Sequence, residues 1–198
     1  MVLIVLDGVD GAGKSTQLRL LVEALETRGV PVRCKHYPDY DHELGQLIKK
    51  YLQRELELPA DSLFLLFLAD MLKDRKELAE HEGVLLLDRY ATSSVAYEAA
   101  LGLELERLAK IVELLQLPSP ALIIYLDVDP RTAMQRKGGG QHRFENAEFL
   151  LKVRQNFLQL AKMHFLCPNW KVVCAERPAE EVFKDVLQAV LEVVNAPK

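Results

Sequence analysis

The sequence contains few cysteines, no long hydrophobic run and no excess of basic residues. Its three cysteines, Cys34, Cys167 and Cys174, are odd in number and widely spaced, which excludes a disulfide framework and a metal site of paired cysteines. We expect reduced and mostly buried thiols. No segment has the length needed to span a bilayer, and the apolar N-terminal run lacks the basic flank of a signal peptide. These absences predict a cytoplasmic protein without a membrane partner.

Charge and length set further limits. The net charge is −4, so a basic surface for nucleic acid is not expected, and a bound polyphosphate would have to meet a local cluster of cations. The chain has 198 residues, of which 49% are hydrophobic. This is the size of one domain with a substantial core, and we therefore predict a single domain over residues 1–198.

The stretch from Gly8 to Thr16 has the spacing of a phosphate-binding loop. It reads Gly-x-x-x-x-Gly-Lys-Ser and stands between the apolar run Val2–Leu6 and a helical pattern. Glycines let backbone N–H groups surround phosphate oxygens at the positive end of the following helix. A glycine-rich turn that contains Lys-Ser by chance is the alternative, but it does not account for the strand–loop–helix context.

Three further side chains suit a magnesium-bound nucleotide. Lys14 provides a cation for the β- and γ-phosphates, and the hydroxyl of Ser15 is placed to bind Mg²⁺. Asp88 ends a buried strand, where a carboxylate would hold Mg²⁺ directly or through water, although a helix-capping Asp is the alternative. The planar guanidinium of Arg89 matches a second phosphate group, whereas a surface ion pair with Asp88 would contribute at most ~1 kcal/mol.

Apolar patterns alternate between strands and helices along the chain. Strands are predicted at residues 2–6, 30–34, 84–88, 121–128 and 170–174. Helices are predicted at 14–27, 44–52, 61–82, 92–101, 104–117, from 130, at 146–165 and at 179–194. This alternation predicts an α/β fold: a five-stranded parallel sheet with helices on both faces and a ligand site at the carboxyl ends of the strands.

A glycine-rich cationic segment is predicted to act as a lid over residues 136–146. Gly138–Gly140 lies between Arg136 and Arg143, and one well-placed arginine can accelerate phosphoryl transfer by ~10³–10⁵. The alternative is a solvated basic loop. Asp10 is unusual inside a phosphate loop, because phosphates repel a carboxylate that does not contact a metal or a sugar hydroxyl. We expect Asp10 to face the acceptor of the phosphoryl group.

Several motifs together resemble the thymidylate kinase family. They are Gly-Val-Asp-Gly-Ala-Gly-Lys-Ser-Thr, Asp88-Arg89-Tyr90-x-x-Ser93-x-x-Ala96-Tyr97, Leu66-Phe67 and Arg143-Phe144-Glu145. The resemblance covers essentially the whole chain. It implies a P-loop NTPase fold and Mg²⁺-dependent transfer of the ATP γ-phosphate to dTMP for dTTP synthesis. It also implies a homodimer, which the apolar helix 62–70 would form.

The resemblance also implies roles at the matching positions. Catalytic roles belong to Asp10, Lys14, Arg89 and Arg143, and metal binding to Ser15 and Asp88. Phe67 would stack on thymine, Arg89 would hold the acceptor phosphate, and Tyr97 would lie near the sugar. The residues implied to bind dTMP are Asp10, Phe67, Arg89, Ser93, Ser94 and Tyr97. Those implied to bind ATP are Gly8, Val9, Asp10, Gly11, Ala12, Gly13, Lys14, Ser15, Thr16 and Arg136.

Some positions depart from the family pattern. Tyr40 stands where an arginine usually helps to hold the acceptor phosphate, and Met71 where an arginine usually donates to thymine O4. Glu98 replaces a common glutamine, and Gly11 stands where one subgroup has an arginine. Because a missing donor weakens selection of the base, a kinase for another nucleotide or deoxynucleoside stays open unless Lys35, His36 or Arg75 compensates.

A protein that binds a nucleotide without catalysis is a further alternative. A GTP-dependent switch would read guanine through an Asn-Lys-x-Asp segment, which the sequence lacks. It would also leave Phe67, Arg89 and Tyr97 without a role, and a catalytically silent dimer could be distinguished only by assay.

Overall fold

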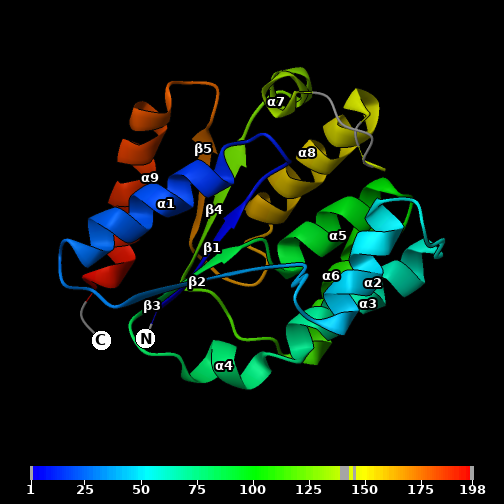
Figure 1. The fold of residues 1–198 in the computed structure, drawn as a ribbon, viewed down its shortest axis with the longest axis horizontal. Helices are drawn as coiled ribbons and strands as arrows, with labels where there is room; N and C mark the ends of the chain where they lie inside the picture. The colour runs from blue at the N-terminus through cyan, green and yellow to red at the C-terminus, as the bar shows by residue number, and fades with distance from the viewer. Residues whose placement is uncertain (1, 139–142, 145, 197–198) are drawn as a thin grey trace.

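The predicted apolar runs form five parallel strands of one sheet (Figure 1). The computed structural model describes residues 2–138, 143–144 and 146–196. The strands are β1 (Val2–Asp7), β2 (Val32–His36), β3 (Val84–Asp88), β4 (Leu122–Asp127) and β5 (Trp170–Cys174), in the order β2-β3-β1-β4-β5. Strands β3, β1 and β4 are central and almost fully buried, which explains their continuous apolar sequences. The predicted fold class is confirmed.

Helices cover both faces of this sheet (Figure 1). Helices α1 and α9 lie on one face and α5 and α8 on the other, while α7 lies at the carboxyl end of the strands. The bounds are α1 (Lys14–Glu26), α2 (Glu43–Leu52), α3 (Ala60–Leu72), α4 (Arg75–Glu80), α5 (Ala91–Ala100), α6 (Leu105–Leu115), α7 (Pro130–Lys137), α8 (Ala147–Lys162) and α9 (Ala179–Val194).

The strand register places the segments that follow β1, β2 and β3 at the same edge of the sheet. In the pairing of β1 with β3, Leu6 stands opposite Asp88, and in the pairing of β2 with β3, His36 stands opposite the same residue. Because all strands are parallel, the chain leaves β1, β2 and β3 at the same edge of the sheet. The phosphate-loop stretch, Tyr37–Tyr40 and Arg89 therefore start side by side.

The predicted helix over 61–82 is interrupted, and this part of the prediction is wrong. It forms α3 and α4, with Lys73 and Asp74 between them. The Lys73 ammonium lies 3.0 Å from carboxylates of Asp39 and Asp70 and 2.8 Å from that of Asp74. This ionic cluster ties the end of α3 to the segment after β2, an interaction between distant residues that helical periodicity cannot reveal.

The expectation of mostly buried cysteines is also wrong. Cys167 is buried, but Cys34 and Cys174 are exposed. Cys34 lies in β2 and Cys174 lies in β5. These are the edge strands of the sheet, and most of their side chains are exposed to solvent. Across residues 2–138, 143–144 and 146–196, no helix combines the length and hydrophobicity that a bilayer crossing requires.

Candidate active site

The loop before α1 leaves the first N–H groups of that helix available to an anion. Gly13 precedes the helix in a left-handed conformation (φ 98°), and no side chain of the described residues caps the N-terminus. Lys14 is buried, and its Nζ donates to the carbonyl oxygens of Gly8 at 3.1 Å and Val9 at 3.3 Å. Burial lowers the pKa of Lys14 to about 8. Such a helix end with an adjacent cation is suited to phosphate.

A cavity of about 630 Å³, here called the loop cavity, lies over this helix end. The predicted residues that line it are Asp10, Gly11, Gly13, Lys14, Ser15, Thr16, Asp88, Arg89 and Arg136. Of the other loop residues, Gly8 accepts from Lys14, while Val9 and Ala12 are buried in the core. The loop cavity therefore unites most of the predicted phosphate-binding set.

Asp88 and Ser15 offer oxygen ligands in the loop cavity. Oδ1 of Asp88 is buried, has no hydrogen-bond partner among the described residues, and lies 4.0 Å from Lys14 Nζ. Asp88 does not cap α5, whose N-cap is Tyr90. The described residues include no cluster of three or more His, Cys, Asp or Glu that could hold a metal. This set fits Mg²⁺, which takes one or two protein oxygens and completes its shell with phosphate and water.

Arg89 occupies a strained position that its neighbours maintain. Its φ of 69° is left-handed, which is unfavourable for a residue with a side chain, and its backbone N–H donates to Leu6 at 3.0 Å. Nη1 donates to the hydroxyl of Ser93 at 3.1 Å, and that hydroxyl donates to the buried carboxylate of Asp7 at 2.5 Å. Thr92 also donates to Asp7. Asp7 thus orients Arg89 through Ser93.

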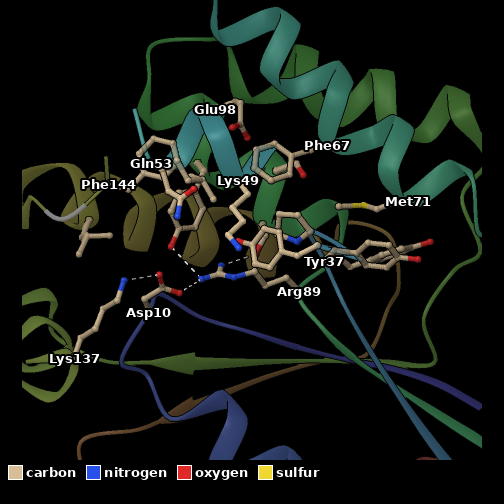
Figure 2. A pocket seen from close by; sticks show the side chains of 18 of the residues that line it. Asp10, Tyr37, Lys49, Gln53, Phe67, Met71, Arg89, Glu98, Lys137 and Phe144 are labelled. Carbon is tan, nitrogen blue, oxygen red and sulfur yellow. Dashed lines mark hydrogen bonds and ion pairs between the residues drawn. The ribbon is translucent and has the colours of Figure 1, made fainter. Parts of the chain in front are cut away.

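Asp10 joins cations from three segments of the chain. Its carboxylate lies 2.5 Å from Arg89 Nη2, 3.1 Å from Lys137 Nζ and 3.9 Å from Lys14 Nζ. The guanidinium of Arg89 is the main reason that the pKa of Asp10 is far below its usual range. Figure 2 shows Asp10 between Lys137 and Arg89. The carboxylate is therefore ionised and joins the loop after β1 to the start of α1, to the residue after β3 and to α7.

A second cavity of about 360 Å³, the aromatic cavity, opens from the same cluster (Figure 2). It shares Asp10, Tyr37, Pro38, Tyr40, Arg89 and Lys137 with the loop cavity. Its inner wall includes the predicted residues Phe67, Ser93, Ser94 and Tyr97, together with Met71 and Glu98. The Tyr97 ring lies 5.4 Å from that of Phe144 and 5.3 Å from the Arg89 guanidinium carbon. A flat, apolar group could lie here with a polar end at Arg89.

Both predicted lid arginines donate to backbone carbonyl oxygens. Arg136 lines the loop cavity, but Nη1 donates to the carbonyl of Ala175 at 2.8 Å. Arg143 donates to the carbonyl of Tyr51 at 3.1 Å and forms an ion pair with Glu57, and it is not among the described residues that line either cavity. Residues 139–142 and 145, which carry the rest of the lid prediction, lie outside the described residues.

The predicted compensating cations are mostly engaged outside the aromatic cavity. Lys35 pairs with Asp74 and Glu77, Arg75 donates to the carbonyl of Leu115, and His36 lines the loop cavity. Sequence analysis missed Lys49, which lines the aromatic cavity with its ammonium 5.8 Å from the centre of the Tyr40 ring. Figure 2 shows Lys49 extending toward Arg89. Lys49 thus places an ammonium group beside Tyr40, which stands where the family usually carries an arginine.

Comparison with known proteins gives a consistent result. A protein-family model described as thymidylate kinase matches residues 6–186. A thymidylate kinase of Danio rerio is 38% identical over 188 residues, covering 93% of this chain and 87% of the relative. One of Homo sapiens is 37% identical over 190 residues, with the same coverages. A solved thymidylate kinase of Candida albicans, whose description reports a broad substrate specificity, matches 98% of this chain and 92% of its own with a TM-score of 0.80 and 27% identity.

Proposed function

This chain belongs to the thymidylate kinase family, and we propose that it transfers the γ-phosphoryl group of ATP to dTMP, giving dTDP for dTTP synthesis. The observation that carries this proposal is the junction of the loop cavity and the aromatic cavity at Asp10 and Arg89. A donor phosphate over α1 and an acceptor phosphate at Arg89 would meet there. A non-catalytic nucleotide-binding protein would not need the second cavity.

On the donor side, the open N–H groups at the start of α1 would bind the ATP phosphates. Lys14 would turn from the carbonyls of Gly8 and Val9 to the β- and γ-phosphates, since its flexible side chain already lies at the loop. Ser15 and Asp88 would hold Mg²⁺ through oxygen. When bound, that ion neutralises charge on the transferring phosphate.

On the acceptor side, Arg89 would hold the phosphate of dTMP, and Phe67 would stack on the base. Tyr97 closes the wall near the sugar, and Lys49 adds a second cation. The attacking oxygen is already anionic, so no side chain is required to remove a proton from it. Catalysis would then consist of positioning two phosphates and stabilising the transferred charge.

Lys137 and Arg143 are both proposed to neutralise developing charge. Lys137 is the nearer of the two, because it contacts Asp10 at the junction. Arg143 would have to exchange its contacts with Tyr51 and Glu57 for a phosphate. Its role is therefore proposed for the substrate complex, as is closure of the lid over residues 136–146.

A homodimer through α3 is proposed from the surface of that helix. Leu65 is 56% exposed, and the half-buried Ala69 follows on the same face one helical turn later. Water contact with such a face is unfavourable, and a second copy of this chain would cover it. Sedimentation of the purified protein as a monomer at assay concentration would refute this proposal.

Measurement of ADP release with ATP and Mg²⁺ against dTMP, dUMP, dCMP, dGMP, dAMP, UMP and thymidine tests the function. We expect dTMP to be preferred, Mg²⁺ removal to abolish turnover, and Lys14→Ala to lower kcat by about 10²-fold or more. Lys110→Ala is the matched control, because Lys110 lies on the exposed side of α6 and, within the described part of the chain, pairs only with Glu113. Near-normal turnover by Lys14→Ala would refute the donor site.

The panel also tests the acceptor. Met71 and Tyr40 line the aromatic cavity where the family usually carries arginines, so another pyrimidine monophosphate is the second candidate substrate. Preference for a different monophosphate would keep the mechanism and replace dTMP as the substrate. No turnover with any acceptor, together with tight ATP binding, would favour the non-catalytic alternative.

A further inference from the structure

The aromatic cavity contains two buried polar groups without a hydrogen-bond partner among the described residues. They are the hydroxyl of Ser94 and the carboxyl of Glu98, both of whose oxygens are unpartnered. Ser94 is 3% exposed and Glu98 is 0% exposed. The two residues are one helical turn apart on α5, so they face the cavity together. Because an unpaired buried carboxyl is costly, it indicates a missing ligand.

The position of Glu98 relative to Arg89 fixes which part of a nucleotide it would meet. Figure 2 shows Glu98 beside Phe67, at the end of the cavity away from Asp10 and Lys137. If the phosphate binds at Arg89 and the base stacks on Phe67, the polar edge of the base lies toward Ser94 and Glu98. This step rests on the proposed function.

The surroundings of Glu98 provide no counter-ion among the described residues. The buried residues of α6 and α8, which pack on α5, are apolar. On α3, Phe67 and Met71 line the cavity, and the carboxylate of Asp70 is held by Lys73 at 3.0 Å.

The charged and titratable groups of α2 do not pair with Glu98 either. The Lys49 ammonium lies at the Tyr40 ring, and the Arg143 guanidinium lies over the ring of Tyr51. Burial raises the pKa of Tyr51, and the negative charge of an ionised Glu98 would add to that rise. Burial raises the pKa of Glu98 well above its usual value, and its own backbone N–H offsets only part of that rise.

We propose that Glu98 binds the base of the acceptor nucleotide as a neutral carboxylic acid, in the place of the arginine donor that Met71 does not provide. Its carbonyl oxygen accepts from thymine N3–H, and its O–H donates to the neighbouring thymine carbonyl oxygen. A neutral carboxyl carries this donor and acceptor side by side, whereas a carboxylate carries acceptors only. Ionised Glu98 would therefore face a thymine carbonyl with like partial charge.

The same chemistry predicts how binding of a pyrimidine base depends on ionisation. A neutral carboxyl also complements cytosine, by accepting from the N4 amino group and donating to N3. A carboxylate would keep one acceptor contact with either base and lose the donor contact with either base. Binding of dTMP should therefore weaken as Glu98 ionises.

The test compares the wild type with Glu98→Gln, whose amide has the same shape and the same donor and acceptor but does not titrate. The KM for dTMP is measured at saturating ATP from about pH 6 to about pH 9.5. Above the pKa of Glu98, the wild-type KM should rise toward about tenfold per pH unit while kcat at saturating dTMP stays level. The variant should not show this rise.

The ratio of the two KM values isolates Glu98. Ionisation of dTMP, of Lys14 and of the phosphates is common to both proteins and cancels. Parallel pH profiles would overturn the inference and leave the proposed function standing. Absence of dTMP phosphorylation in both proteins at every pH would overturn the proposed function and the inference with it.

A second measurement covers the case in which Glu98→Gln does not fold. Infrared difference spectra of the wild type are recorded with and without dTMP near neutral pH. A carboxylic acid C=O band that shifts on dTMP binding supports the proposal, because Asp10 at the same cavity is ionised. A spectrum in which only carboxylate bands change would overturn it.

Discussion

Gly11 offers a test of how the phosphate loop is joined to α7. Its φ is +84°, and a Cβ atom there would lie 2.1 Å from the carbonyl oxygen of Ala133 on α7. Gly13 has a similar φ of +98°, but no heavy atom of the residues that the structure describes, its chain neighbours aside, lies within 4 Å of the corresponding Cβ position. The two glycines therefore share the conformational constraint and differ in the space around them.

The substitutions Gly11→Ala and Gly13→Ala should differ in their effect on stability. A left-handed alanine costs roughly 1–2 kcal/mol at either position. At Gly11 the backbone of α7 must also move, and overpacking of this kind adds about 1–3 kcal/mol. We expect losses of about 1–2 kcal/mol for Gly13→Ala and about 2–5 kcal/mol for Gly11→Ala.

The assay is urea unfolding of both variants and the wild type. Nucleotide is left out, because a bound phosphate would stabilise the loop to a different extent in each protein. The midpoint at an unchanged m-value gives the difference in unfolding free energy. Both variants replace glycine by alanine, so their unfolded chains are stiffened equally and that contribution cancels. A Gly11→Ala protein as stable as Gly13→Ala, or more so, would refute the close packing of α7 on the loop.

Two further predictions concern the cations of the site. Lys49→Ala should raise the KM for dTMP by about fivefold and leave the KM for ATP unchanged, as expected for an ion pair made by an exposed lysine, with Lys50→Ala as the control. Equal kinetic effects of the two substitutions would contradict the role of Lys49. Because burial lowers the pKa of Lys14 to about 8, kcat/KM for ATP should fall as pH rises through that value, since the free enzyme loses the cation. Between about pH 8 and 10.5, Lys14 holds more protons in the unfolded chain than in the folded protein, so it makes the free energy of unfolding rise with pH. In urea unfolding, Lys14→Ala should lack this contribution.

Sequence patterns predicted those features that depend on local spacing and on the parallel sheet. The phosphate loop follows from residues adjacent in the chain, and Asp88 and Arg89 follow because parallel strands end at one edge. Lys49 could not be distinguished from Lys50, because the rotation of α2 is set by burial of Ile48 and Tyr51 in the folded protein. A helical pattern alone does not fix which of two adjacent lysines faces a cavity.

The sequence around Asp7 could have predicted a buried polar contact. A charged residue at the end of the buried run Val2–Leu6 needs partners, because burial of an unpaired carboxylate is costly. Those partners, Thr92 and Ser93, are far away in the sequence, and only the pairing of β1 with β3 brings them to Asp7. The signal could have indicated a buried polar contact, but not that it orients Arg89.

The cluster at Asp10 explains how a protein with net charge −4 presents a positive site to phosphate. Lys14, Arg89 and Lys137 would repel one another, and the ionised carboxylate between them offsets that repulsion before any nucleotide binds. Phosphate oxygens that enter the junction can take over the same role, because they bring negative charge to cations that are already assembled. Arg89 and Lys137 are then in place before a phosphoryl group is transferred, so the rearrangement is confined to Lys14 and the lid.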